Sequence, residues 1–169
     1  MPIGIKHRLH QGKWVVSGQL NIGLNTGKFF EESGLRSGYD TYTLSPKLNI
    51  GRSFGQFYAQ GSTGVDIRFN DYSSNFVFDV EVGAKPFNRF WAIAFLNLSS
   101  SFKNGEVVLP ANNLLTGLYV NDQEYTAYGF KVIFEATDKF GILANYTTAL
   151  SGNNVPRRAV IGGGLYAKF

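Results

Sequence analysis

The sequence predicts an all-β fold in which antiparallel strands run up and down to form a barrel. Apolar and polar residues alternate with a period of two in successive segments, and the connections between these segments are alternately short and long. Fifteen Phe and nine Tyr stand beside 20 Gly and only 5 Pro. Aromatic residues pack well on a pleated surface, so the composition also favours strands. We expect a single domain over residues 1–169.

The first two predicted strands occupy Ile3–His10 and Trp14–Leu24. Successive side chains of a strand point to opposite faces, so alternation separates an apolar face from a polar one. In the second segment the even positions are apolar or Gly. The polar faces carry Lys6, Arg8 and His10 in the first segment and Ser17, Gln19 and Asn21 in the second.

Six later segments alternate in the same way. Their apolar faces begin at Tyr42, Phe57, Phe76, Tyr128, Phe140 and Ala159.

The segment Phe90–Phe102 is ambiguous, because apolar residues occupy both of its faces. The odd positions of Trp91–Phe95 compete with the even positions of Ala92–Leu98. We expect the even positions to face outward, since this choice puts Asn97 and Ser99 on the polar side.

The connections between the strands differ in length in a regular way. About nine strands of roughly 8–14 residues result, and a membrane-crossing strand needs about 9–11 residues. Short turns at one rim and longer loops at the other are typical of outer-membrane barrels. The turns are Gln11–Lys13, Ser53–Gln56, Phe87–Arg89 and Thr137–Lys139, and the loops are Asn25–Asp40, Asp71–Ser74, Asn104–Gln123 and Ser151–Pro156.

Periodicity alone leaves open which face points inward. A soluble barrel buries its apolar face, whereas a membrane barrel turns that face to lipid. Opposite charges favour a crowded interior in which they pair: if Asp71–Ser74 closes a hairpin that puts Asp66 opposite Asp79, Arg68 lies diagonally across from Asp79. We therefore predict a polar lumen. Its charged and polar residues are Lys6, Arg8, Lys47, Asp66, Arg68, Asp79, Glu81, Lys85, Lys131, Glu135, Asn145 and Lys168.

Aromatic residues flank the predicted short turns. This placement agrees with an aromatic girdle at a membrane interface, and packing of hairpin ends explains it equally well. The residues are Trp14, Phe57, Phe87, Phe90 and Phe140.

The chain ends in Gly-Gly-Gly-Leu-Tyr-Ala-Lys-Phe. This ending resembles the C-terminal strand of bacterial outer-membrane β-barrels, with a terminal Phe, alternating apolar residues before it and a Gly five residues back. It departs from that pattern at Gly162, where a polar residue is usual, and at Ala167, where a larger apolar residue is usual. The resemblance implies an outer-membrane location in a Gram-negative bacterium, contact with outer-membrane lipid, and recognition by the barrel-assembly machinery through Gly164, Tyr166 and Phe169.

More narrowly, Leu20–Gly27 resembles strands of the transporter-annotated barrels grouped with phenol meta-pathway proteins, in a Bacteroidetes-like version. This resemblance implies a transport role and indicates no substrate.

The odd strand count predicts that further strands complete the barrel. Bacterial single-chain barrels have an even number of strands, with both ends on the periplasmic side. If Gln11–Lys13 is a periplasmic turn, Ile3 lies at the outer rim, and we expect missing N-terminal strands and a complete barrel of about ten to twelve strands. Alternatively, Ile3–His10 is a plug or an edge segment, which leaves about eight strands.

Composition excludes several other classes. The chain has no Cys for a disulfide, and no run of about 18 apolar residues forms a membrane-spanning helix. The formal charge of +4 is spread singly along the chain, so we expect no nucleic-acid partner. His7 and His10 lack an acid–nucleophile constellation, and no acidic spacing suits a metal. We expect no enzyme activity and no cofactor.

Three functions remain. The first is a porin-like passive pore or transporter for small solutes, with lumenal Lys and Arg side chains that favour anions. The second is a plugged structural barrel in a larger outer-membrane complex, because about eight strands leave room only for side chains. Its protein partner would bind the apolar loop 104–123. The third is a soluble, lipocalin-like ligand-binding barrel.

Overall fold

The computed structural model describes residues 2–25, 27, 29–30, 35–108, 119–156 and 158–168. Nine long strands and one short hairpin make up its regular structure, and none of the described residues belongs to a helix long and apolar enough to cross a membrane. The strands are β1 (Pro2–Gln11), β2 (Val15–Gly23), β3 (Phe29–Phe30), β4 (Leu35–Arg36), β5 (Thr43–Phe54), β6 (Phe57–Arg68), β7 (Asn75–Phe87), β8 (Phe90–Ser101), β9 (Glu124–Phe134), β10 (Phe140–Asn153) and β11 (Val160–Ala167).

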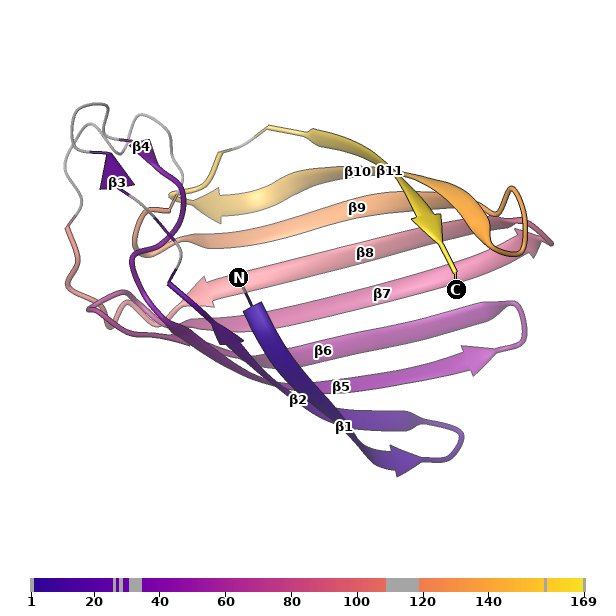
Figure 1. Cartoon of the computed structure of the whole chain (residues 1–169), viewed down its shortest axis with the longest axis horizontal. Helices are drawn as coiled ribbons and strands as arrows, with labels where there is room; N and C mark the ends of the chain where they lie inside the picture. The colour runs from indigo at the N-terminus through magenta and orange to yellow at the C-terminus, as the bar shows by residue number, and fades with distance from the viewer. Residues whose placement is uncertain are drawn as a thin grey trace.

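The nine long strands form one antiparallel sheet in the order β1-β2-β5-β6-β7-β8-β9-β10-β11 (Figure 1). Each strand pairs with its neighbours along the chain, and the small β3–β4 hairpin lies in the connection between β2 and β5. The predicted all-β, up-and-down antiparallel arrangement is confirmed.

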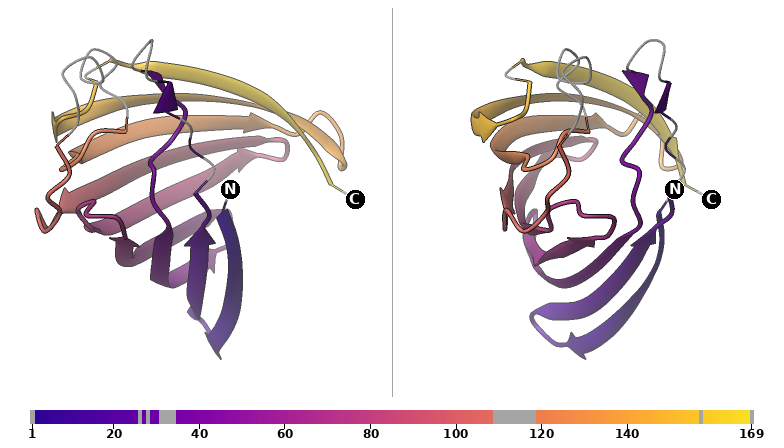
Figure 2. Two further views of the ribbon diagram at one scale, coloured as in Figure 1. Left: turned by 60° about the vertical axis from the view of Figure 1, so that its left-hand side comes forward. Right: turned by 90° about the vertical axis from the view of Figure 1, so that its left-hand side faces the viewer.

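The sheet curls into an incomplete ring, with the longer loops at one end and the short turns at the other (Figures 1 and 2). Its edges are β1 and β11, and the described residues contain no ladder that joins them. Both edge strands start at the loop end and finish at the turn end (Figure 1). Direct pairing between them would therefore be parallel, in contrast to every other pair in the sheet.

β1 is an edge strand of the sheet and not a separate plug. It pairs with β2 over nearly its whole length, from Pro2 opposite Gly23 to Gln11 opposite Val15. The register shifts between Arg8 and His10, so that His10 lies opposite Val16 and not on the face shared by Lys6 and Arg8. The expectation for His10 was wrong, because an extra residue in a β-bulge reverses the side to which the following residues point.

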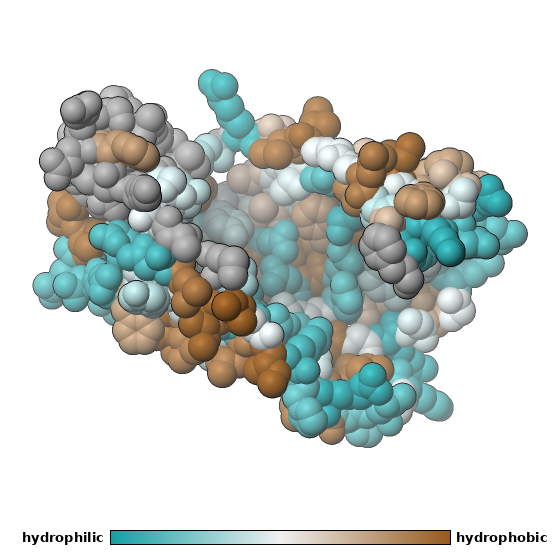
Figure 3. Space-filling model, viewed as in Figure 1, coloured by the Kyte–Doolittle hydropathy of each residue, from teal (hydrophilic) through white to brown (hydrophobic). Residues whose placement is uncertain are grey.

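The outer face of the sheet is apolar. Figure 3 shows hydrophobic side chains gathered on the lower left of the outer wall and hydrophilic ones among those in the hollow. Ile161 and Leu165 on β11 are 82% and 83% exposed. Other exposed apolar side chains on this face are Ile5, Leu20, Ile22, Leu48, Phe57, Phe78, Val80, Val82, Phe130, Val132, Phe140 and Ile142.

The interior is mostly polar where side chains are fully enclosed. Four apolar side chains are buried among the described residues, against eight polar ones. The apolar four are Tyr72, Val77, Ile93 and Val120, and the polar eight are Ser17, Thr41, Ser45, Ser73, Ser74, Asn75, Ser99 and Ser101.

The ambiguous strand β8 is oriented by its neighbour. Asn97 lies directly opposite Asp79 and donates a hydrogen bond of 2.6 Å to its carboxylate. Residues directly opposite each other in a ladder share a face. The odd positions of β8, including Trp91, therefore lie on the inner face with Asp79.

The β6–β7 register differs from the one expected. Asp66 lies opposite Asn75, and Ser62 takes the place opposite Asp79. The expected pairing of Asp66 with Asp79 was wrong, because the chain reverses at Phe69–Tyr72, where the Tyr72 N–H donates to the Phe69 carbonyl at 3.3 Å, two residues before the expected turn Asp71–Ser74. Asn70 and Asp71 both take positive φ angles, of 55° and 59°, which suits short polar side chains in a tight reversal.

Candidate functional site: a polar cavity inside the curved sheet

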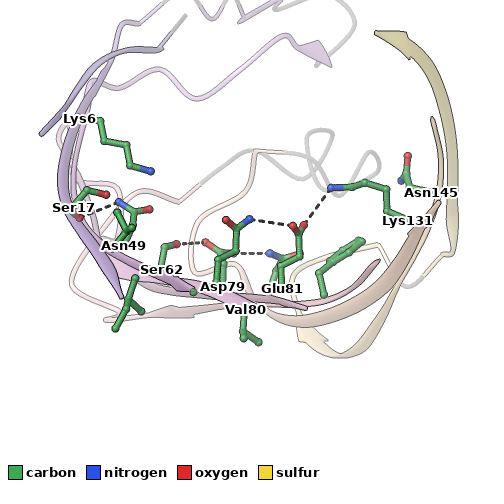
Figure 4. A pocket seen from close by; sticks show the side chains of 16 residues that line it. Lys6, Ser17, Asn49, Ser62, Asp79, Val80, Glu81, Lys131 and Asn145 are labelled. Atoms are coloured by element: carbon green, nitrogen blue, oxygen red, sulfur yellow. Dashed lines mark hydrogen bonds and ion pairs between the residues drawn. The ribbon is translucent and has the colours of Figure 1, made fainter. Parts of the chain in front are cut away.

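A cavity of about 530 Å³ lies on the inner face of the sheet (Figure 4). This volume falls within the range of small-molecule sites. Lys6 extends from one wall, Asp79 and Glu81 rise from the floor, and Lys131 and Asn145 come from the opposite wall (Figure 4). Val80, on the same strand as the two acids, points away from the cavity (Figure 4). The charged and amide side chains of the lining are Lys6, Asn49, Gln60, Asp79, Glu81, Asn97, Lys131 and Asn145.

Glu81 is the most highly connected side chain of this lining. Its carboxylate accepts hydrogen bonds from the Tyr58 hydroxyl at 2.6 Å and from the Gln60 amide at 3.0 Å. The Lys131 ammonium forms an ion pair with it at 3.3 Å and lies 5.8 Å from the centre of the Phe95 ring. The charges of Glu81 and Lys131 therefore compensate each other within the cavity wall.

Asp79 has only neutral partners. Ser62 donates to one carboxylate oxygen at 3.0 Å, and Asn97 donates to the other at 2.6 Å. These two bonds hold the carboxylate in place from the neighbouring strands β6 and β8. They leave acceptor capacity on an anion that has no ion pair among the described residues.

Inner-face aromatic rings lie over glycines of adjacent strands. A Cβ atom added at Gly83 or Gly141 would lie within 3 Å of the ring of Tyr58 or Tyr166, respectively. The small residue lets the ring lie flat against the sheet, which keeps the interior open where a larger neighbour would force the ring into the cavity. Gly129 makes the same room for the Phe95 ring.

Gly162 makes room for Asn145. The two residues are directly opposite in the β10–β11 ladder, and a Cβ at Gly162 would lie 2.6 Å from the Asn145 Oδ1 atom. The glycine therefore leaves room for the amide at its place on the cavity wall.

A second ion-pair group stands at the turn end of the sheet. Glu135 follows β9 and receives hydrogen bonds from Lys85 at 2.5 Å and Lys168 at 3.0 Å. The Lys85 ammonium also lies 5.4 Å from the Trp91 ring centre. These ammonium hydrogen bonds lower the pKa of the Glu135 carboxyl from 4.5 to about 2.

The Glu135 group predicts a specific acid sensitivity. Because its folded-state pKa is depressed, the Glu135 carboxylate adds stability at pH values above 4.5, and this addition is lost as the pH falls toward about 2. We expect Glu135→Gln to lower the free energy of unfolding at pH 7 and to lower it much less near pH 2. Denaturant titrations at a series of pH values measure this difference. A penalty that persists unchanged at pH 2 would contradict the assignment.

At the loop end of the sheet, contacts of Arg68 and Tyr39 hold together loops that are far apart in the chain. The Arg68 guanidinium lies 4.4 Å from the centre of the Tyr39 ring and donates to Asn75 Oδ1 at 3.3 Å. The Tyr39 ring packs edge-on against Tyr72 and Tyr119, with centroids 5.5 and 5.4 Å away. Burial raises the pKa of the Tyr39 hydroxyl, and the nearby Arg68 charge opposes this rise.

A network of buried polar side chains lies beside these rings and is joined to them through Arg68. Asn75 is 1% exposed and donates to Ser99 Oγ at 2.8 Å and to the Gln123 carbonyl at 2.9 Å. Ser73 is fully buried and donates to the Asp122 carboxylate at 2.5 Å. Buried polar groups are costly unless they are hydrogen-bonded, so this network fixes the loops 69–74 and 119–123 to the ends of the strands.

The remaining predicted lumenal residues lie outside the cavity lining. Arg8 is opposite Ser17 and donates to Gln11, Lys47 lies over Gly64, and Asp66 is opposite Asn75. Of the basic side chains expected to favour anions, Lys85, Lys131 and Lys168 have acidic partners. Lys6 and Lys47 have none among the described residues.

The predicted assembly signal and loop are described only in part. Gly164 lies opposite Leu143 and Tyr166 opposite Gly141, whereas Phe169 is outside the described residues. In loop 104–123 residues 109–118 are likewise outside them. Val108 is 92% exposed, and Tyr119 contacts Tyr39.

The chemistry available in the cavity is binding chemistry. Carboxylates, ammonium groups and amides surround it, and the described residues contain no group of three or more His, Cys, Asp or Glu placed to hold a metal ion. His7 faces outward opposite Gly18. No family model matches the chain, and no curated protein matches it closely enough to count as a relative.

Sequence reasoning missed the loop-end network. Tyr39, Ser73 and Asn75 fall in or beside connections with no periodicity, and Asn121 and Asp122 lie in the predicted loop Asn104–Gln123. The cluster of short polar residues at 70–75 was the one available signal, because such residues frequently bond to backbone groups.

Proposed function

We propose that this chain is an outer-membrane β-barrel protein of a Gram-negative bacterium that acts as a porin-like passive pore or transporter for small solutes. The observation that supports this proposal most strongly is the inverted distribution of polarity. Apolar side chains such as Val80 and Leu165 cover the outside of the sheet, and the enclosed side chains are mostly polar. Lipid around the sheet and water within it account for both faces.

Aromatic residues at the turn end support the same location. Trp14, Phe57, Phe87 and Phe140 are exposed beside the short turns, where a headgroup layer would lie. Aromatic side chains are enriched at the membrane–water interface of membrane barrels. The short-turn end would then face the periplasm and the loop end the exterior.

Closure of the barrel sets a condition on strand number. Because β1 and β11 run in the same direction, a fully antiparallel barrel needs an odd number of further strands to fill the gap between these two edges. A total of about ten or about twelve strands meets this condition, whereas a total of about eleven does not. The mass of the folded species extracted from its membrane in mild detergent tests which polypeptides supply these strands.

Vesicle swelling tests the pore. Lipid vesicles that contain the folded protein should swell faster in an isosmotic solution of glycerol than vesicles that contain heat-unfolded protein, in which glycerol crosses only the lipid. Equal rates of swelling would overturn the pore. Recovery of the folded protein from the soluble fraction without detergent would instead favour the lipocalin-like alternative.

A plugged accessory barrel is the second candidate, and the Tyr39 group favours it. Tyr39 bridges the connection before β5 to the segment before β9, and its hydroxyl lies 3.4 Å from the Val120 carbonyl oxygen. If these rings close the loop end, Tyr39→Ala will raise the rate of swelling. Phe87→Ala, which removes an exposed ring at the other end, is the matched control. Equal rates in wild type and both variants would mean that the Tyr39 group is not a barrier.

A further inference from the structure

We propose that the cavity on the inner face binds a small zwitterion, a solute with one carboxylate and one ammonium group such as an amino acid. This inference rests on the proposed pore and adds the substrate class. It follows from which polar groups of the cavity lining are already engaged and which remain free to bind a solute.

The charged groups of the lining balance. Lys6 and Lys131 are positive, and Asp79 and Glu81 are negative. The pair between Lys131 and Glu81, at 3.3 Å, removes one charge of each sign from the cavity. One cation, Lys6, and one anion, Asp79, then remain.

Neither remaining charge has an ion pair among the described residues. The Lys6 ammonium has no hydrogen bond to them and points from the β1 wall into the cavity (Figure 4). The Asp79 carboxylate accepts from Ser62 and Asn97, both neutral, and keeps free lone pairs. A solute that carries both signs of charge satisfies both residues at once, whereas an anion or a cation leaves one of them opposed or unpaired.

Arg8, two residues from Lys6 on β1, adds a second positive charge to that wall. Lys47 and Asp66 lie diagonally across from each other on the adjacent strands β5 and β6, so together they favour neither wall. Arg68, the basic residue on the acidic side, is occupied by Asn75 and the Tyr39 ring. The field across the cavity therefore orients a zwitterion with its carboxylate toward β1 and its ammonium toward β7.

The Asn145 amide supplies a third contact. It lines the cavity on the wall opposite Lys6 and has no hydrogen bond within the described chain (Figure 4). A carboxamide both donates and accepts, so it suits the hydroxyl or amide group that many amino acids carry in addition to their charges.

Four solutes of the same three-carbon skeleton test this assignment. L-serine is the zwitterion, glycerol the neutral solute, glycerate the anion and 2-amino-1,3-propanediol the cation. In vesicles that contain the full chain, we expect L-serine to enter fastest. Lys6→Met and Asp79→Asn should each lower serine entry by about tenfold, the effect of one lost charge-assisted contact. They should shift selectivity in opposite directions, toward the cation and the anion respectively.

Lys13→Met is the matched control, because it removes one positive charge in the exposed turn between β1 and β2. It should leave all four rates unchanged. Comparison of the electrophoretic mobility of heated and unheated protein verifies that each variant is folded. Lys6→Met lies on an exposed edge strand, so it tests the proposal even if Asp79→Asn fails to fold.

Calorimetric titration of L-serine into the detergent-solubilised protein separates this proposal from the pore. Equal entry of all four solutes, without change in either variant, would overturn the zwitterion site and keep the pore. Binding of L-serine that both variants lose, with no solute entry, would keep the site and overturn passive conduction. The absence of both binding and entry would overturn both.

Discussion

Val80→Arg will destabilise the folded protein in lipid by about 2–4 kcal/mol, the cost of a basic side chain near the centre of a bilayer on the outside of a barrel. Val80 lies in the middle of β7, opposite Gly61 on β6 and Leu96 on β8, and points away from the cavity. The added charge would have no polar partner at that depth. Reversible unfolding by denaturant in lipid vesicles measures the change.

Gln60→Arg is the control at the same depth. Gln60 is close to Val80 in the sheet but lies on the inner face, where its amide donates to Glu81. An arginine there keeps a donor beside an acid, so we expect a change of less than about 1 kcal/mol, since substitutions toward a lumen alter selectivity more than stability. If Val80→Arg were as mild as this control, the outer face would be in water and the membrane location would be wrong.

Asn75→Ala will remove the centre of the buried loop-end network. The substitution takes away two bonds that Asn75 donates and one that it accepts from Arg68, and it leaves the Ser99 hydroxyl and Gln123 carbonyl enclosed without this partner. We expect a loss of about 1–3 kcal/mol, the usual cost of a buried polar group deprived of its bond. Denaturant unfolding of the two proteins measures it.

Asn49→Ala provides the comparison for Asn75. The Asn49 amide also lies on the inner face, but its bonds to Ser17 and Gln19 are both 3.4 Å long and its side chain is only half-buried. The loss there should be smaller. An equal loss at both positions would mean that burial of Asn75 adds nothing to its role. Asn75→Ala should also increase hydrogen exchange of the amides in loops 69–74 and 119–123.

The strand pattern and the face of most residues could be predicted from the sequence. Alternation is a property of each strand by itself, because successive side chains point to opposite sides whatever the neighbouring strand does. Even in β8, where apolar residues occupy both faces, the polar residues Asn97 and Ser99 were enough to choose the side. The positions of the short turns followed from the same breaks in alternation.

Register could not be predicted in the same way, because it depends on how each connection folds. Asp66 pairs with Asn75, four residues before the expected Asp79. A shift by an even number of residues keeps every side chain on its face, so the polar face was unaffected while the expected charge pairs were wrong. At the bulge before His10 the shift is by a single residue, and there the predicted face was wrong as well.

The sequence by itself determined a nine-segment alternation and therefore a sheet with one apolar and one polar surface. Only the tertiary structure decided which polar groups meet. It paired Glu81 with Lys131 and Glu135 with Lys85 and Lys168, and it left Lys6 and Asp79 without ionic partners on different walls of one cavity. The physical reason is that alternation acts between adjacent residues, whereas curvature of the sheet brings together side chains from strands far apart in the chain.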